Sequence, residues 1–199
     1  MKEFIYFLFY DIIKKYGVIC KNIKKISSKM NISQGVIKLD INTVNPFIQA
    51  VGDIFIQFGI GGTSVVSMEQ KDKMYVETDI TAIIGITGDV RGNVSYSMSE
   101  ETAIKIISIM MMGMPVNCVD EMGLSALGEM TNMVTGHAAM LLGKGNVKID
   151  ITPPSIVYGK DMHFSTHTNE ITMVKLSTDV GEIEVDLGLG DGSSSKIVS

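Results

Sequence analysis

The sequence predicts an α/β protein of the α+β type, in two layers: an antiparallel meandering sheet with two long, pseudo-symmetric helices and a further helix. Three observations support this fold class. Segments with an apolar residue every three or four positions are interspersed with runs in which apolar and polar residues alternate. Short turns join several of these runs, which favours antiparallel strands. The two long helical segments also align with one another without gaps, as in an internal repeat.

Length and charge limit the classes of function open to the chain. Its 199 residues, 45% of them hydrophobic, are enough for one sizeable core. Seven of the 17 basic residues but only two of the 22 acidic ones precede Met30, which leaves 10 basic against 20 acidic residues in the body. Because phosphate contacts need clustered Lys and Arg, the body argues against nucleic acid and against an anionic membrane surface. No apolar stretch approaches the roughly 18 residues of a membrane span, so we expect no membrane insertion.

Changes in composition predict three segments. Residues 1–29 contain the apolar run FIYFLFY followed by lysines, without the cleavage site of a secretory signal. Two interpretations are open: an amphipathic helix lying on the body, or an appendage before an alternative start at Met30. We favour the appendage because the domain pattern begins just after Met30. Residues 30–190 are the domain. The glycine- and serine-rich stretch from Gly188 predicts a flexible end, and residues 191–199 are assigned to a tail.

Cysteine and histidine are too sparse for a disulfide framework or a metal site. Cys20 and Cys118 belong to no CxxC motif, which suits a reducing cytosol and predicts a cytoplasmic protein. Of the three histidines, only His163 and His167 are spaced to share a strand face. The sequence therefore predicts no metal and no cofactor of the chain's own.

The first half of the chain predicts one long helix followed by strands. Residues 37–41 alternate and form a short strand or a lead-in. Asn45 followed by Pro46 is typical of a helix start, and glycines from Gly59 onward end the helix. The strands expected next are residues 63–68, 75–86 and 93–98, the last two joined by a hairpin turn.

A further helix is expected at residues 101–112, capped by Ser99 and with acidic residues in its first turn. Its run IISIMMM predicts burial over most of its surface, with the methionines filling the core rather than binding a ligand. Gly113 and Pro115 then break the chain.

The second long helix is expected at residues 120–143, followed by more strands. Its apolar stripe is Leu124, Leu127, Val134, Ala138 and Leu141. The strands expected after it are residues 147–151, 155–158, 162–167, 171–177 and 182–187.

The second long helix also has a polar ridge. At about 100° per residue, Ser125, Glu129, Asn132 and Gly136 fall on one narrow stripe. A carboxylate and a carboxamide therefore project side by side, next to Gly128 and Gly136. Because glycine costs a helix about 1 kcal/mol relative to alanine, these small residues suggest a face that another surface approaches closely. The alternative is an ordinary solvated face whose glycines pack on a neighbouring helix.

The internal repeat provides a comparison for this ridge. QAVGDIFIQFG in the first long helix aligns with SALGEMTNMVT in the second, which places Asp53 on Glu129 and Ile56 on Asn132. The packing residues agree between the copies, but isoleucine makes no side-chain hydrogen bond. We therefore expect one working face and one silent face around a pseudo-two-fold axis. The strands that follow also align, residues 78–98 with residues 169–189.

The ridge resembles the CheC, CheX and FliY phosphatase family of bacterial chemotaxis, and the CheX branch most closely. That family has an Asp or Ser, a Glu four residues later, an Asn three residues after that, and a proline about twenty residues on. CheC relatives have two such helices, whereas CheX relatives keep one, as this chain does. The resemblance spans residues 31–190. The matching residues here are Ser125, Glu129, Asn132 and one of Pro153 and Pro154.

The resemblance implies dephosphorylation of a phosphorylated CheY-type response regulator. It implies that Asn132 orients the attacking water, that Glu129 pairs with a lysine of the regulator, and that Ser125 is a peripheral contact. Gly128 and Gly136 would let the regulator approach the helix, and Mg²⁺ would come from the regulator. Such a sparse site can suffice because phosphoryl transfer needs mainly positioning and charge stabilisation.

Two other functions stay open: a docking module of the same fold at a flagellar switch or receptor array, and an unrelated small-molecule enzyme. CheX relatives form dimers through their sheets, so the resemblance also implies a homodimer. The strongly alternating final strands are expected to offer the pairing edge.

Overall fold

The computed structural model describes residues 41–143, 147–164 and 170–192. The expectations for residues 1–29, for the start at Met30, for the strand or lead-in at residues 37–40 and for residues 193–199 lie outside the described residues. The helices are α2 (Ile41–Gln57), α3 (Glu100–Met110) and α4 (Glu121–Leu142). The strands are β1 (Ser64–Lys71), β2 (Met74–Val76), β3 (Ile80–Gly88), β4 (Val90–Met98), β5 (Ile149–Ile151), β6 (Ser155–Tyr158), β7 (Met162–Phe164), β8 (Ile171–Thr178) and β9 (Gly181–Asp191).

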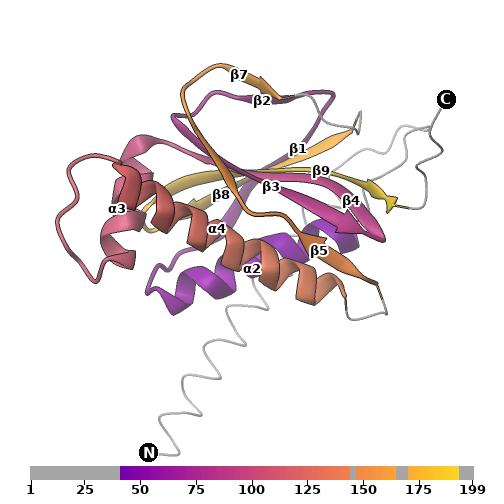
Figure 1. Ribbon diagram of the computed structural model, residues 1–199, viewed down its shortest axis with the longest axis horizontal. Helices are drawn as coiled ribbons and strands as arrows, with labels where there is room; N and C mark the ends of the chain where they lie inside the picture. Colours follow the sequence, from indigo (N-terminus) through magenta and orange to yellow (C-terminus); the bar gives the residue numbers. More distant parts are fainter. Residues whose placement is uncertain (1–40, 144–146, 165–169, 193–199) are drawn as a thin grey trace, which may run out of the picture. The chain divides into compact units, whose positions relative to one another are not determined.

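Seven strands form one antiparallel sheet in the order β1-β8-β9-β4-β3-β5, and β6 pairs with β3 beside β5. The short strands β2 and β7 form a separate antiparallel pair. This pair lies on the side of the main sheet that faces away from the helices (Figure 1). The predicted α+β class and its antiparallel sheet are therefore confirmed.

The internal repeat relates the two halves of the sheet: each strand on one side of the centre has an equivalent at the same place on the other side. The aligned strands are β3 with β8 and β4 with β9, so β1 takes the place of β5 and β6 at the opposite edge. At the centre, Ser95 of β4 faces Asp186 of β9, and the alignment of the two copies makes these two residues equivalent. The sheet thus has a pseudo-two-fold axis between β4 and β9, as the internal repeat predicts.

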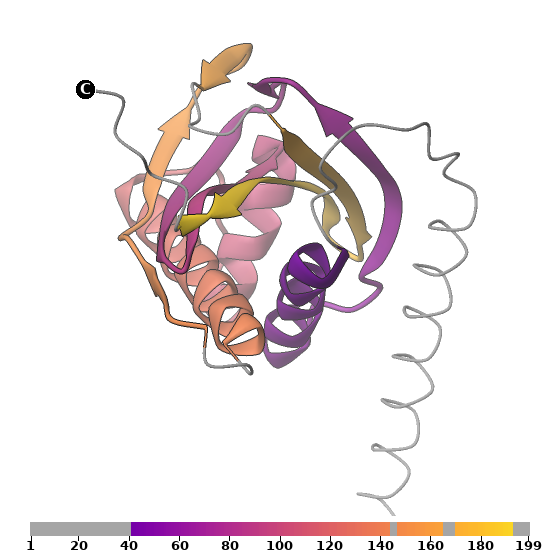
Figure 2. The same ribbon diagram turned by 90° about the vertical axis from the view of Figure 1, so that its right-hand side faces the viewer.

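Helices α2 and α4 lie side by side under one face of the sheet (Figure 2). The core fills the space between them and the inward residues of the central strands, because those residues recur at every second position of each strand. Its largest fully buried members include Phe47, Phe55, Ile84, Tyr96, Ile107 and Leu127. This packing fixes the orientation of α4, and with it the direction in which its ridge points.

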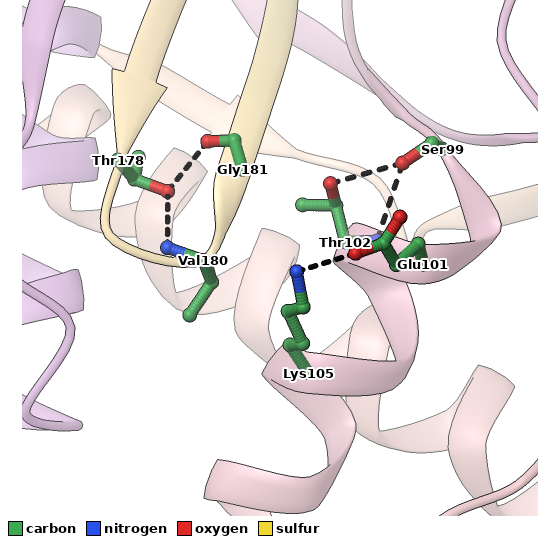
Figure 3. A network of polar contacts seen from close by, with 7 residues as sticks. All are labelled: Ser99, Glu101, Thr102, Lys105, Thr178, Val180 and Gly181. Carbon is green, nitrogen blue, oxygen red and sulfur yellow. Dashed lines mark hydrogen bonds and ion pairs between the residues drawn. The ribbon is translucent and has the colours of Figure 1, made fainter.

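Helix α3 begins at the predicted cap. The Ser99 hydroxyl accepts a hydrogen bond from the Thr102 backbone N–H at 3.2 Å, and Lys105 pairs with Glu101 one turn along (Figure 3). The β8–β9 turn lies beside this cap, with Gly181 at φ 142° close to the Thr102 side chain. A side chain at residue 181 would meet Thr102, so glycine lets α3 pack against the turn.

Two predicted boundaries are wrong. Helix α2 begins at Ile41 rather than at Asn45, with Pro46 inside it. Val44, buried to 1% exposure, extends the apolar stripe before the proline, and this burial outweighs the hydrogen bond that proline cannot donate. The chain from Gly188 to Asp191 is not a flexible end, because it continues β9 and pairs with residues 90–93 of β4.

Three further expectations are corrected. The single strand expected at residues 75–86 is split, because β2 leaves the main sheet to pair with β7. The methionines of the run IISIMMM do not all fill the core, because Met112, two residues past the end of α3, is 98% exposed. The final strands β8 and β9 offer no free edge, since each has a neighbour on both sides in the sheet.

Candidate active site on helix α4

Helix α4 is defined at both ends by local interactions. The Asp120 side chain accepts a hydrogen bond from the Gly123 N–H at 2.8 Å, which satisfies one of the free donors of the first turn. At the other end, the Gly143 N–H donates to the Ala139 carbonyl at 2.9 Å. The helix is therefore a rigid support for any side chain on its exposed face.

A buried hydrogen bond attaches α4 to the sheet. The hydroxyls of Tyr96 on β4 and Thr135 on α4 lie 2.9 Å apart, and both residues are buried. Thr135 also donates to the Thr131 carbonyl at 2.8 Å. Because a buried hydroxyl without a partner is costly, this pair favours one position of the helix along the sheet.

A second polar contact joins α4 to α2. The His137 Nε2 lies 3.0 Å from the Asp53 Oδ2, and the Gln49 side-chain amide donates to the same carboxylate oxygen at 3.4 Å. Asp53 is the residue that the repeat aligns with Glu129. In the first copy the acidic side chain is therefore used for helix packing, and Ile56 replaces the amide.

The segment between β5 and β6 packs against α4. A Cβ added to Gly128 would lie 3.5 Å from the Pro154 Cγ and 3.6 Å from the Ile156 Cδ1. Gly128 is buried and faces this segment, and an added methyl there would make ordinary van der Waals contacts. Gly136 is half-buried, and its nearest neighbour by the same measure is the Ile151 Cδ1 at 3.8 Å.

The predicted ridge lies on the outer face of α4. Ser125 and Glu129 are exposed and Asn132 is half-buried. Within the described parts of the chain, neither the Glu129 carboxylate nor the Asn132 amide has a hydrogen-bond or ion-pair partner. One carboxylate and one carboxamide are thus held side by side with all their hydrogen-bonding capacity unused.

The described residues supply few groups for other chemistry. Among them, no three His, Cys, Asp or Glu side chains gather where they could hold a metal ion. No described helix has the length and apolar character needed to cross a membrane. What the ridge can do is accept and donate hydrogen bonds to a molecule brought to it.

Comparison with known proteins finds a similar family. The family model of the chemotaxis phosphatase CheX matches residues 80–176, which include α3, α4, strands β3 to β7 and most of β8. Over these residues the chain is similar to the CheX family. A relative from Thermotoga maritima, the CheY-P phosphatase CheX, is 48% identical over 83 residues, which is 42% of this chain. The match spans about half of that relative's length, 54%.

Solved CheX structures share the fold. The chemotaxis protein CheX from Vibrio vulnificus is 25% identical, with a TM-score of 0.65 over 74% of this chain and 99% of that one. The CheX–CheY–BeF3–Mg²⁺ complex from Borrelia burgdorferi is 23% identical, with a TM-score of 0.61 over 77% of this chain and 100% of that one. These likenesses agree with the helix-and-sheet arrangement described above.

The structure places the predicted residues as follows. It brings Ser125, Glu129 and Asn132 onto one outer ridge, which continues to Gly136. Gly128 lies off this ridge and faces Pro154. Sequence reasoning missed the Asp53–His137 contact, which joins residues 84 positions apart. It also missed the exposed methionines Met122 and Met140 of α4, although the three- and four-residue spacing of the ridge extends to both.

Proposed function

We propose that the chain dephosphorylates a phosphorylated CheY-type response regulator. The observation that supports this most directly is the unpartnered pair of Glu129 and Asn132, held on a rigid helix of a CheX-like domain. The Thermotoga maritima relative is named as a CheY-P phosphatase, and the Borrelia burgdorferi complex joins a CheX to CheY, BeF3 and Mg²⁺.

The chemistry needs little from this chain. Water attacks the phosphorus of an acyl phosphate, the bond between phosphorus and the regulator's aspartate oxygen breaks, and phosphate and a carboxylate are released with a proton to solvent. The Asn132 carbonyl oxygen accepts a hydrogen bond from the water, while its NH₂ donates to a phosphoryl oxygen. Fixing one water in line with the breaking bond is an orientation effect that can supply several kcal/mol.

Glu129 has a different role in this proposal. One turn from Asn132, its carboxylate pairs with a lysine of the regulator and sets the register of α4 against the phosphorylated pocket. Ser125 makes a peripheral contact, and Gly136 allows close approach. Mg²⁺ belongs to the regulator, where it neutralises charge on the phosphoryl oxygens.

The decisive experiment follows the decay of a phosphorylated CheY-type receiver with and without the chain. Wild-type protein should accelerate the decay, and Asn132→Ala should lose about a hundredfold or more of the acceleration while still binding the receiver. Ile56→Ala, at the equivalent place on α2, is the matched control and should keep full activity. Glu129→Gln should weaken binding. A wild-type chain that binds the receiver without accelerating decay would identify a docking module instead.

We also propose a homodimer formed through a sheet edge. The edges of the main sheet are β1 on one side and β5 with β6 on the other, and Val66 at a bulge in β1 is 52% exposed. An unpaired edge is a template for another strand. Sedimentation showing only monomer at micromolar concentration would contradict this. The proposed partner also implies a cytoplasmic location.

A further inference from the structure

The ridge of α4 extends beyond the predicted polar residues. Steps of three or four residues connect six positions, and at about 100° per residue they fall within about 80° of the helix circumference. The six positions are Met122, Ser125, Glu129, Asn132, Gly136 and Met140. From end to end the stripe is about 27 Å long, at about 1.5 Å per residue.

Methionines stand at both ends of this stripe and are exposed to an unusual degree. Met122 is 62% exposed and Met140 60%, whereas Met130 on the inner face of the same helix is 2% exposed. A large apolar side chain is normally turned inward when the helix allows it. The buried Met130 thus lies on the inner face of α4, whereas Met122 and Met140 lie on the outer face, in line with Glu129 and Asn132.

The length and chemistry of the stripe fit a receiver domain. A specific interface buries about 800 Å² on each partner, more than one carboxylate and one amide can supply. If the middle of the stripe enters the phosphorylated pocket, Met122 lies about 10 Å from Glu129 and Met140 about 12 Å from Asn132 along the helix. Both would then meet the rim of the pocket, since a small domain is about 30 Å across. Methionine is flexible and polarisable, which suits an apolar contact that must adapt to a partner.

We propose that Met122 and Met140 contact the receiver on either side of its phosphorylation site, determining affinity and choice of receiver without taking part in the chemical step. This inference rests on the proposed function. It divides the stripe into a central polar pair that acts on the phosphoryl group and two apolar ends that hold the receiver.

The test separates binding from turnover. Kd is measured for a CheY-type receiver from the same genome, activated with beryllofluoride and Mg²⁺, and kcat and KM are measured with the phosphorylated receiver. Met122→Ala and Met140→Ala should each raise Kd and KM about three- to tenfold, and the double variant by more, with kcat within twofold of wild type. Met122→Leu should restore most of the affinity. Ile56→Ala, at a 46% exposed apolar residue on α2, is the matched control and should change nothing.

Each outcome is decisive. A double variant with unchanged Kd and KM, or one that loses kcat at unchanged KM, overturns the inference while the proposed function stands. A wild-type chain that neither binds nor dephosphorylates the receiver overturns both. Equal effects of Ile56→Ala and the methionine variants would show a general loss of folding. Urea denaturation of the same samples would reveal that loss, and it would also overturn the inference.

Discussion

The Nε2 of His137 lies 3.0 Å from the Oδ2 of Asp53, so helix α4 is held to helix α2 by the acidic residue that the repeat aligns with Glu129. The side chains are 23% and 17% exposed, which places the contact at the edge of the interface between the helices. The acidic position shared by the two aligned helices thus has two environments: an exposed carboxylate on α4 and an interhelical partner on α2.

Asp53→Ala and His137→Ala are each expected to lower the free energy of unfolding by about 0.5 to 1 kcal/mol, because the pair is partly exposed and screened by solvent. The double variant should lose less than the sum, since the second change removes a contact already broken. Urea denaturation measures all three. Phosphatase activity should persist in Asp53→Ala; a loss of turnover at unchanged stability would show that α2 takes part in the chemistry.

Gly128→Ala and Gly136→Ala are expected to act alike on stability and differently on binding. At both positions an added methyl makes ordinary contacts, the closest at 3.5 Å and 3.8 Å respectively, so the gain in helix propensity should raise unfolding free energy by about 0.5 to 1 kcal/mol. Only Gly136 lies on the outer stripe, so only Gly136→Ala should weaken receiver binding, by severalfold. Thermal unfolding and receiver titration measure the two effects. Weakened binding in Gly128→Ala would contradict the packing role assigned to that residue.

The Tyr96–Thr135 hydrogen bond predicts an order of stabilities. Tyr96→Phe leaves Thr135 still donating to the Thr131 carbonyl, so it should cost about 1 kcal/mol. Thr135→Val leaves the buried Tyr96 hydroxyl without this partner, so it should lower the free energy of unfolding by more, about 1 to 3 kcal/mol. Adding Tyr96→Phe to Thr135→Val should recover part of that loss. Urea denaturation gives the ranking, and the reverse order would mean that the hydroxyl of Tyr96 is satisfied elsewhere.

Asp186 predicts a dependence of stability on pH. It is fully buried at the centre of the sheet, and neither carboxylate oxygen has a hydrogen-bond partner among the described residues. Burial raises the pKa of Asp186 to about 7; nearby Glu184 adds to the rise and Lys71 opposes it. Because this pKa exceeds the unfolded value of about 3.9, the folded state binds the proton more tightly. The contribution of this proton to the free energy of unfolding is therefore fully present below about pH 4 and is lost as the pH rises through about 7.

Asp186→Asn should remove this dependence. Between pH 5 and pH 8 the wild-type protein should lose about 2 to 3 kcal/mol more unfolding free energy than the variant. Urea denaturation at several pH values measures the difference, and Asp150→Asn, at an exposed position of β5, serves as the control. Parallel curves for wild type and Asp186→Asn would contradict the raised pKa.

Local sequence determined much of the fold and the composition of the ridge. Alternation of apolar and polar residues predicted most strands, and the caps Ser99 and Asp120 lie where helices α3 and α4 begin. The relation among Ser125, Glu129 and Asn132 was predictable for the same reason: all three belong to one helix, and the helical period alone decides which of its residues share a face.

Tertiary structure decided the rest. No local pattern encodes the pairing of residues that lie far apart in the chain. Three features depend on such pairings: the positions of β8 and β9 inside the sheet, the Asp53–His137 contact and the approach of Pro154 to Gly128. The helical start before Pro46 and the exposure of Met112 likewise depend on what packs against each segment. The chain's own periodicity therefore determined which side chains stand together on α4, whereas only packing decided that this face turns outward, because burial depends on neighbours that the helix itself does not contain.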